Sequence, residues 1–175
     1  MWVMWIGGAV LLLLTGSFAW GLVRIRRGVA QATAAARRIA PDEIPGLVAE
    51  FVAKTEAYLG TVVRLDDPEE GARTLSVLMD EPERLKPIYS RDGFWWRFAL
   101  PAGAALGEYM CRHAGGRWIL GEAGEPVIEI GIAGGESAIT HPFAKVIEHV
   151  VSGERGEIYL YLQASLQLDR IAKAV

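Results

Sequence analysis

The sequence has few of the residues that build redox or metal chemistry. Its 175 residues include one cysteine, Cys111, and three histidines, His113, His141 and His149. A single cysteine permits no internal disulfide, so the fold does not depend on an oxidising compartment. Neither an HExxH nor a CxxC pattern occurs, and His141 and His149 are too widely spaced to share a metal on one helix. We expect no metal site, with His141 at the start of a helix and His149 on the surface.

Catalytic and nucleotide-binding motifs are also absent. The chain contains no GxSxG, Walker A or GxGxxG sequence. The glycine-rich run over 131–136 lacks the lysine and hydroxyl residue of a phosphate-binding loop, and Glu136 would repel a phosphate. Cys111 and His113 are two residues apart on a predicted helix, so they point in different directions and cannot act as nucleophile and base. We therefore expect no catalytic residue, no cofactor and no enzymatic activity.

Charge is unevenly distributed along the chain. Residues 1–41 carry five arginines and no acidic residue, whereas the remaining residues include 13 basic and 21 acidic ones. An acidic domain without a basic cluster argues against nucleic acid as a partner, because phosphate contacts need grouped lysines and arginines. The mean hydropathy of the chain is +0.22, which is high for a chain with this charge content. The apolar residues that raise it are concentrated in the opening segment.

The uncharged opening segment predicts a single transmembrane helix over residues 1–23. The 22 residues from Trp2 to Val23 would extend about 33 Å as a helix, close to the ~30 Å hydrocarbon thickness of a bilayer. A cleaved signal peptide is the alternative, but its positive charge would precede the apolar run rather than follow it. The expected membrane-interface residues are Trp2, Trp5, Trp20, Arg24, Arg26 and Arg27.

The position of the arginines predicts the orientation of the chain. Because they follow the apolar segment, the N-terminus is expected outside a bacterial inner membrane and the rest of the chain in the cytoplasm. Residues 24–41 are expected to form a basic juxtamembrane helical connector, and residues 42–175 a cytoplasmic α+β domain. In the connector, Arg37 and Arg38 are interpreted either as contacts to anionic lipid or an acidic partner, or as solvated charges that only fix topology.

The spacing of apolar residues predicts a mostly helical α+β domain with a small antiparallel sheet of two or three strands. Helices are expected from Asp42 to Val63, after Asp67 and Pro68, from Gly93 to His113 with an interruption or bend at Pro101, and from Pro142 to Gly153. Strands are expected over Arg117–Leu120 and Val127–Ile132, joined by a turn. The tail from Glu157 fits either a strand or a helix, and its alanine, leucine and glutamine content favours a helix.

Short motifs over residues 100–153 resemble certain uncharacterised bacterial α+β domains. The resemblance is carried by Leu106-Gly107-Glu108-Tyr109, Gly115-Gly116-Arg117-Trp118, the run from His141 to Val146, and Gly153. Those domains have a helix with an L-G-E core, a strand that starts with G-G-x-W, and a P-F-x-K-V helix that ends in glycine. The resemblance implies a fold arrangement and no activity. His141 departs from the pattern, in which a small polar residue is expected.

Five residues near the start of the third predicted helix form a candidate partner-binding surface: Phe94, Trp95, Trp96, Arg97 and Phe98. Consecutive aromatic residues on a helix in a small domain cannot all be buried, although core packing would account for about half of them. Exposed Trp and Arg side chains are enriched at binding hot spots. The sequence therefore favours a non-enzymatic protein-binding module, an accessory subunit or adaptor of an inner-membrane complex. Its partners would be the lipid bilayer and a membrane protein.

A small membrane-tethered enzyme is the alternative function. It would use Glu108, on a largely apolar helix, together with His113 or His141, and these groups would have to lie within hydrogen-bond reach of one another. In the structural interpretation, Glu108 bonds to the backbone or to Arg117. An immunity-type protein and a purely structural spacer are two further alternatives.

Overall fold

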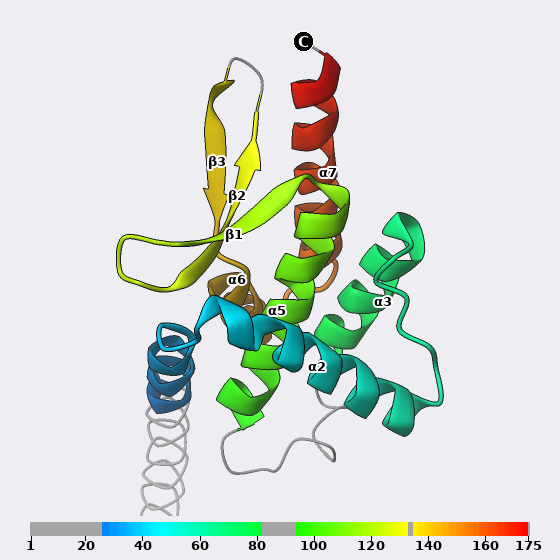
Figure 1. Ribbon diagram of the computed structural model, residues 1–175. Helices are drawn as coiled ribbons and strands as arrows, with labels where there is room; N and C mark the ends of the chain where they lie inside the picture. The colour runs from blue at the N-terminus through cyan, green and yellow to red at the C-terminus, as the bar shows by residue number, and fades with distance from the viewer. Residues whose placement is uncertain (1–25, 82–93, 133–134, 175) are drawn as a thin grey trace, which may run out of the picture.

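The computed structural model describes residues 26–81, 94–132 and 135–174, without the side chains of 94–96 and 169–174. Figure 1 shows helices gathered around one central helix, with a small sheet on one side. After a helix over 26–36, the elements follow in this order: η1 (Pro41–Glu43), α2 (Ile44–Leu59), α3 (Pro68–Asp80), α5 (Phe94–His113), β1 (Gly116–Leu120), β2 (Pro126–Gly131), β3 (Ser137–Thr140), α6 (Pro142–Ser152) and α7 (Glu157–Ala174). The described chain is thus an α+β fold.

The helices begin and end at residues whose local chemistry favours a boundary. Asp67 caps α3, where its Oδ1 accepts hydrogen bonds from the backbone N–H groups of Glu69 and Glu70 at 2.9 and 2.7 Å. Gly60 ends α2 with a φ of 63°, a left-handed conformation that favours glycine. The helix predicted to reach Val63 therefore stops at Leu59. Apolar residues continue at helical spacing beyond Gly60, so the periodicity of the sequence did not show that the helix ends there.

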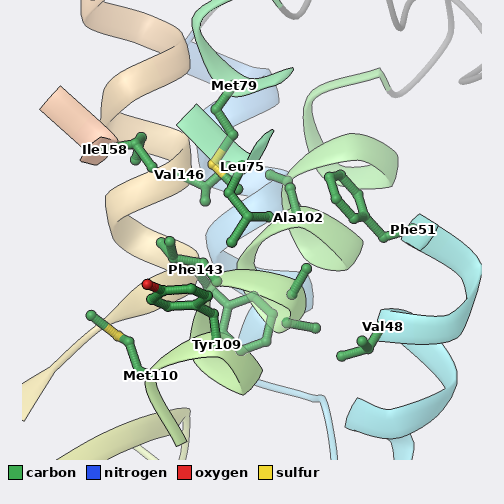
Figure 2. Close-up of a cluster of buried hydrophobic side chains, with 14 of the residues drawn as sticks. Val48, Phe51, Leu75, Met79, Ala102, Tyr109, Met110, Phe143, Val146 and Ile158 are labelled. Carbon is green, nitrogen blue, oxygen red and sulfur yellow. The ribbon is translucent and has the colours of Figure 1, made fainter. Parts of the chain in front are cut away.

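The central helix α5 is lined by small residues that let its neighbours approach closely. Six alanines and glycines along it are buried: Ala99, Ala102, Gly103, Ala104, Ala105 and Gly107. Helix α2 covers one side and α6 another, while α3, α7 and the sheet complete the packing. The core in Figure 2 shows Phe51 of α2 and Phe143 of α6 on either side of α5. The helix is continuous through Pro101, so the predicted interruption does not occur.

The sheet has three antiparallel strands in the order β1-β2-β3. Its register places Trp118 opposite Ile128 and Ile128 opposite Thr140, so these side chains share the face toward α5 and α7. On the other face, the Arg117 guanidinium lies 2.6 Å from the Glu129 carboxylate. The sequence predicts β1 and β2 directly, whereas β3 is four residues long and carries too little alternation to be detected alone.

The helix over 26–36 packs onto the rest of the fold. Ala32 is completely buried, and Ala36 and Ile39 are 6% and 8% exposed. All three belong to the same hydrophobic core as α2, α5 and α6. The segment predicted as a separate connector therefore contributes an apolar stripe to the core, while its arginines Arg37 and Arg38 are exposed.

The predicted architecture requires a correction at the membrane helix. Across the described ranges, no helix combines the length and the apolar character needed to cross a bilayer. The two longest described helices carry charges within them, including Arg97 and Glu108 in α5, and such charges are costly in hydrocarbon. The helix predicted over 1–23, with interface residues Trp2, Trp5, Trp20 and Arg24, lies outside the described residues. The other two predicted interface residues, Arg26 and Arg27, are exposed.

Candidate functional site

A cavity lies where the helix over 26–36, the β1–β2 turn and the start of α6 meet. Its volume is about 160 Å³. Nine residues line it: Thr33, Ala36, Arg37, Glu125, Pro126, His141, Phe143, Ala144 and Ile147. Its walls are largely apolar, and three of the lining residues carry ionisable side chains. The cavity therefore combines an apolar wall with a few polar groups, which is the usual composition of a small-ligand site.

Glu125 gives the cavity its most unusual feature. The Oε2 atom of its carboxylate is buried and has no hydrogen-bond partner, while Oε1 lies 3.7 Å from Nδ1 of His141. The side chain lies over the β1–β2 turn, close to Gly121. A Cβ added at Gly121 would lie 3.0 Å from the Cδ atom of Glu125. Buried polar atoms in native proteins almost always have a partner, and Oε2 has none among the described residues, although it has too little accessible surface to meet an occupant of the cavity.

The start of α6 lines the same cavity. His141 is the N-cap residue, as predicted, but its side chain makes no capping hydrogen bond. The first helical residue is Pro142, which has no N–H, and the N–H of Lys145 is the first to bond back, to the carbonyl of His141 at 2.9 Å. The N–H groups of Phe143 and Ala144 therefore have no acceptor within the helix. Both residues line the cavity, at the positive end of the helix dipole.

Arg37 adds a positive charge to the wall. It is exposed, and no other side chain in the described parts of the chain forms an ion pair with it. Arg37, Glu125 and His141 are the lining residues with ionisable side chains, and Glu125 carries the negative charge among them. The cavity therefore offers both charged and apolar side chains to a ligand.

The size of the cavity limits its occupant. Sites for drug-sized ligands usually measure roughly 300–1,000 Å³, and this cavity is about half the lower bound. The cavity is too small to enclose a whole nucleotide or a large cofactor, and it is partly open to solvent.

A second, broader depression of about 540 Å³ lies between the helix over 26–36, α2 and α5. Arg38 and Glu43 are its charged residues. The Oε2 atom of Glu43 already accepts a hydrogen bond from the backbone N–H of Ala40 at 2.8 Å. The carboxylate of Glu43 therefore already has a hydrogen-bond donor within the chain.

The predicted aromatic surface is described only in part. Phe98 is fully buried, and its ring lies 6.4 Å from that of Phe51. It is a core residue and offers no side-chain surface to a partner. Arg97 is exposed and makes contacts of its own within the chain. The side chains of the remaining three, Phe94, Trp95 and Trp96, lie outside the described residues.

The groups of the alternative enzyme hypothesis do not converge. Glu108 pairs with Arg112 on the next turn of α5 at 2.8 Å, and not with Arg117 as the structural interpretation proposed. The Nε2 atom of His113 lies 2.8 Å from the carbonyl oxygen of Leu65. His141 lies at the cavity. The three groups thus have separate local partners.

Cys111 is partly buried on α5, where burial and the nearby Glu108 carboxylate raise the pKa of its thiol to about 11. Since the thiolate is the reactive form, the folded protein should contain about 100-fold less thiolate than a thiol of ordinary pKa 9.0. We expect a correspondingly slow reaction with a disulfide reagent at pH 7.5, and normal reactivity in 8 M urea. Equal rates in the two conditions would contradict the burial of this thiol.

His149 is a buried histidine, which corrects its prediction as a surface residue. It is 2% exposed, with Nε2 at 3.0 Å from Oδ1 of Asp80 and Nδ1 at 3.5 Å from Oε2 of Glu157. Glu157 also accepts a hydrogen bond from Lys145. Asp80 accepts one from the N–H of Gly156 at 3.0 Å. These contacts join the end of α3 to α6 and the start of α7.

Two pKa shifts follow from this network. The hydrogen bond from Lys145 lowers the pKa of the Glu157 carboxyl, and partial burial opposes that change. Burial tends to lower the pKa of Lys145, but the hydrogen bond and charge of Glu157 outweigh it and raise the pKa. The pair is therefore held in its charged form. Together with His149, it holds three helices together.

The described residues form an α+β domain with a small cavity that is lined by apolar and ionisable side chains. Among the described residues, no group of histidine, cysteine and carboxylate side chains is placed to hold a metal ion. The chain matches no protein-family model, and neither a curated protein nor a solved structure is significantly similar to it. The likeness to uncharacterised bacterial domains therefore stays a prediction.

Proposed function

We propose that the chain is a non-enzymatic protein-binding module that holds part of a partner in the cavity of Arg37, Glu125 and His141. The supporting observation is a cavity in which the ionisable side chains of Arg37, Glu125 and His141 lie among apolar residues. The module would act as an accessory subunit, contributing recognition rather than chemistry.

The experiment compares a blocked cavity with an intact one. Ala144 is an exposed residue of α6 that lines the cavity, so Ala144→Phe should fill it. Ala53→Phe is the matched control, because Ala53 is exposed on α2 and lines neither depression. Tagged chains are purified from cells that normally express the protein, and circular dichroism checks that both variants fold. We expect a defined partner to co-purify with the wild type and the control, and to be lost from Ala144→Phe. Equal recovery with both variants would refute this function.

A further inference from the structure

We infer that the helix over 26–36 and the turn after it lie flat against a membrane surface that contains anionic lipids. The contact is made by the arginine face, which consists of the exposed side chains of Arg26, Arg27, Arg37 and Arg38. It lies at the surface of the membrane and needs no helix that crosses the bilayer. It goes beyond the proposed function, because it assigns a second partner to a different part of the molecule.

The first step concerns the placement of the arginines. The second pair follows the first by 11 residues, close to three helical turns, so both pairs lie on the same side. The N–H of Arg37 still bonds to the carbonyl of Thr33 at 3.2 Å, so the helical path continues to the second pair. The buried residues Ala32 and Ala36 lie on the opposite side. Since the helix stands at the margin of the fold (Figure 1), its arginine face points away from the core.

The second step concerns the charge. No carboxylate in the described parts of the chain forms an ion pair with the arginine face. Other exposed arginines do have such partners, since Arg64 lies 3.6 Å from Glu70 and Arg73 lies 2.9 Å from Glu69. The helix itself contains no acidic residue. Four positive charges therefore stand without a negative partner along about 16 Å of helix, and they favour an anionic surface from outside the chain.

The third step concerns the kind of anion. Residues 42–175 include 13 basic and 21 acidic residues, so a nucleic acid that followed the molecular surface would meet repulsion beyond the helix. A planar membrane contacts only one face and brings anionic headgroups to both pairs of arginines at once. The uncharged residues from Trp2 to Val23, just before the arginine face, favour a lipid over an acidic protein, because apolar side chains partition to a membrane surface.

The test measures how the full chain distributes between neutral and anionic vesicles. Protein purified in detergent is mixed with vesicles of phosphatidylcholine, without or with about one-third phosphatidylglycerol, and detergent is removed before flotation. The uncharged segment interacts with both vesicles alike, so the ratio reports the arginines. Each arginine near an anionic surface strengthens binding about fivefold, and we expect at least a roughly tenfold preference for anionic vesicles at ~0.05 M salt. It should largely disappear at ~0.5 M salt. Equal binding at low salt would overturn the inference.

Paired substitutions test the flat orientation. Arg26→Gln with Arg27→Gln, and separately Arg37→Gln with Arg38→Gln, should each reduce the preference for anionic vesicles about fivefold or more. Both pairs should matter, because a helix that lies along the surface brings both of its ends to the lipid. A loss confined to the first pair would mean that only the start of the helix approaches the membrane, and it would overturn the flat orientation.

Arg64→Gln with Arg73→Gln is the matched control. It removes two exposed positive charges from another part of the chain and changes the net charge equally. The preference for anionic vesicles should stay unchanged, and circular dichroism checks that every variant folds. An equal loss in this control would mean that net charge, and not the arginine face, determines the preference. If the arginine variants instead lost a protein partner and kept the vesicle preference, the face would bind an acidic protein and the lipid contact would be rejected.

Discussion

Replacing Gly103 with alanine should destabilise the protein by about 2 kcal/mol, because the added methyl group overpacks the contact between α5 and α6. A Cβ at this position would lie 2.5 Å from Cδ1 of the Phe143 ring and 2.9 Å from its Cα. The ring could turn, but the Cα moves only if α6 moves with it. The contact also supports the cavity, since Phe143 lines it. Urea denaturation followed by circular dichroism measures the loss.

The same substitution at Gly46 provides the control. Gly46 is exposed on α2, and a Cβ there would meet nothing within 4 Å. Alanine has the higher helix propensity, so Gly46→Ala should stabilise the protein by about 0.5–1 kcal/mol. If both substitutions stabilised the protein equally, the close approach of α5 and α6 would be wrong.

The helix boundaries were predictable because each depends on a few neighbouring residues. Asp67 with Pro68 begins α3, and Pro142 begins α6, which Gly153 ends with a φ of 69°. Prediction failed where tertiary packing outweighed a local signal. Pro101 lies inside the continuous helix α5. The other helices and the sheet pack against α5 on several sides. Val63 continues the apolar stripe of α2 but follows the glycine that ends the helix.

The cavity could not be predicted, because its charged residues come from three distant segments. Sequence reasoning related Arg37 to lipid or a partner, placed His141 at a helix start, and assigned no role to Glu125. Only the packing of the helix over 26–36 against α6 and the β1–β2 turn brings them together. The burial of His149, in contrast, could have been predicted from the sequence. It follows the buried residues Pro142 and Val146 at helical spacing, on the inner face of α6.

Replacing His149 with leucine should reduce the free energy of unfolding by about 1–3 kcal/mol, the usual cost of leaving a buried polar group without its hydrogen-bond partner. Leucine fills a similar volume, so the loss reports polar contacts rather than a void. Among the described residues, it would leave the Asp80 carboxylate, 17% exposed, with the N–H of Gly156 as its remaining partner. It would also remove the contact between His149 and Glu157. Urea denaturation at pH 7 measures the change, with His141→Leu as control. His141 is 52% exposed, so its replacement should alter stability by less than about 0.5 kcal/mol.

A double-mutant cycle separates the His149–Asp80 contact from general disruption of the core. In Asp80→Asn the side chain can still accept from Gly156 but no longer carries a charge opposite the imidazole. His149→Leu should therefore cost about 1–2 kcal/mol less in this background than in the wild type. Identical costs in the two backgrounds would mean that the two side chains do not interact. A difference of the expected size would show that this contact holds the end of α3 against α6, and that the buried histidine stabilises the fold on which the cavity is built.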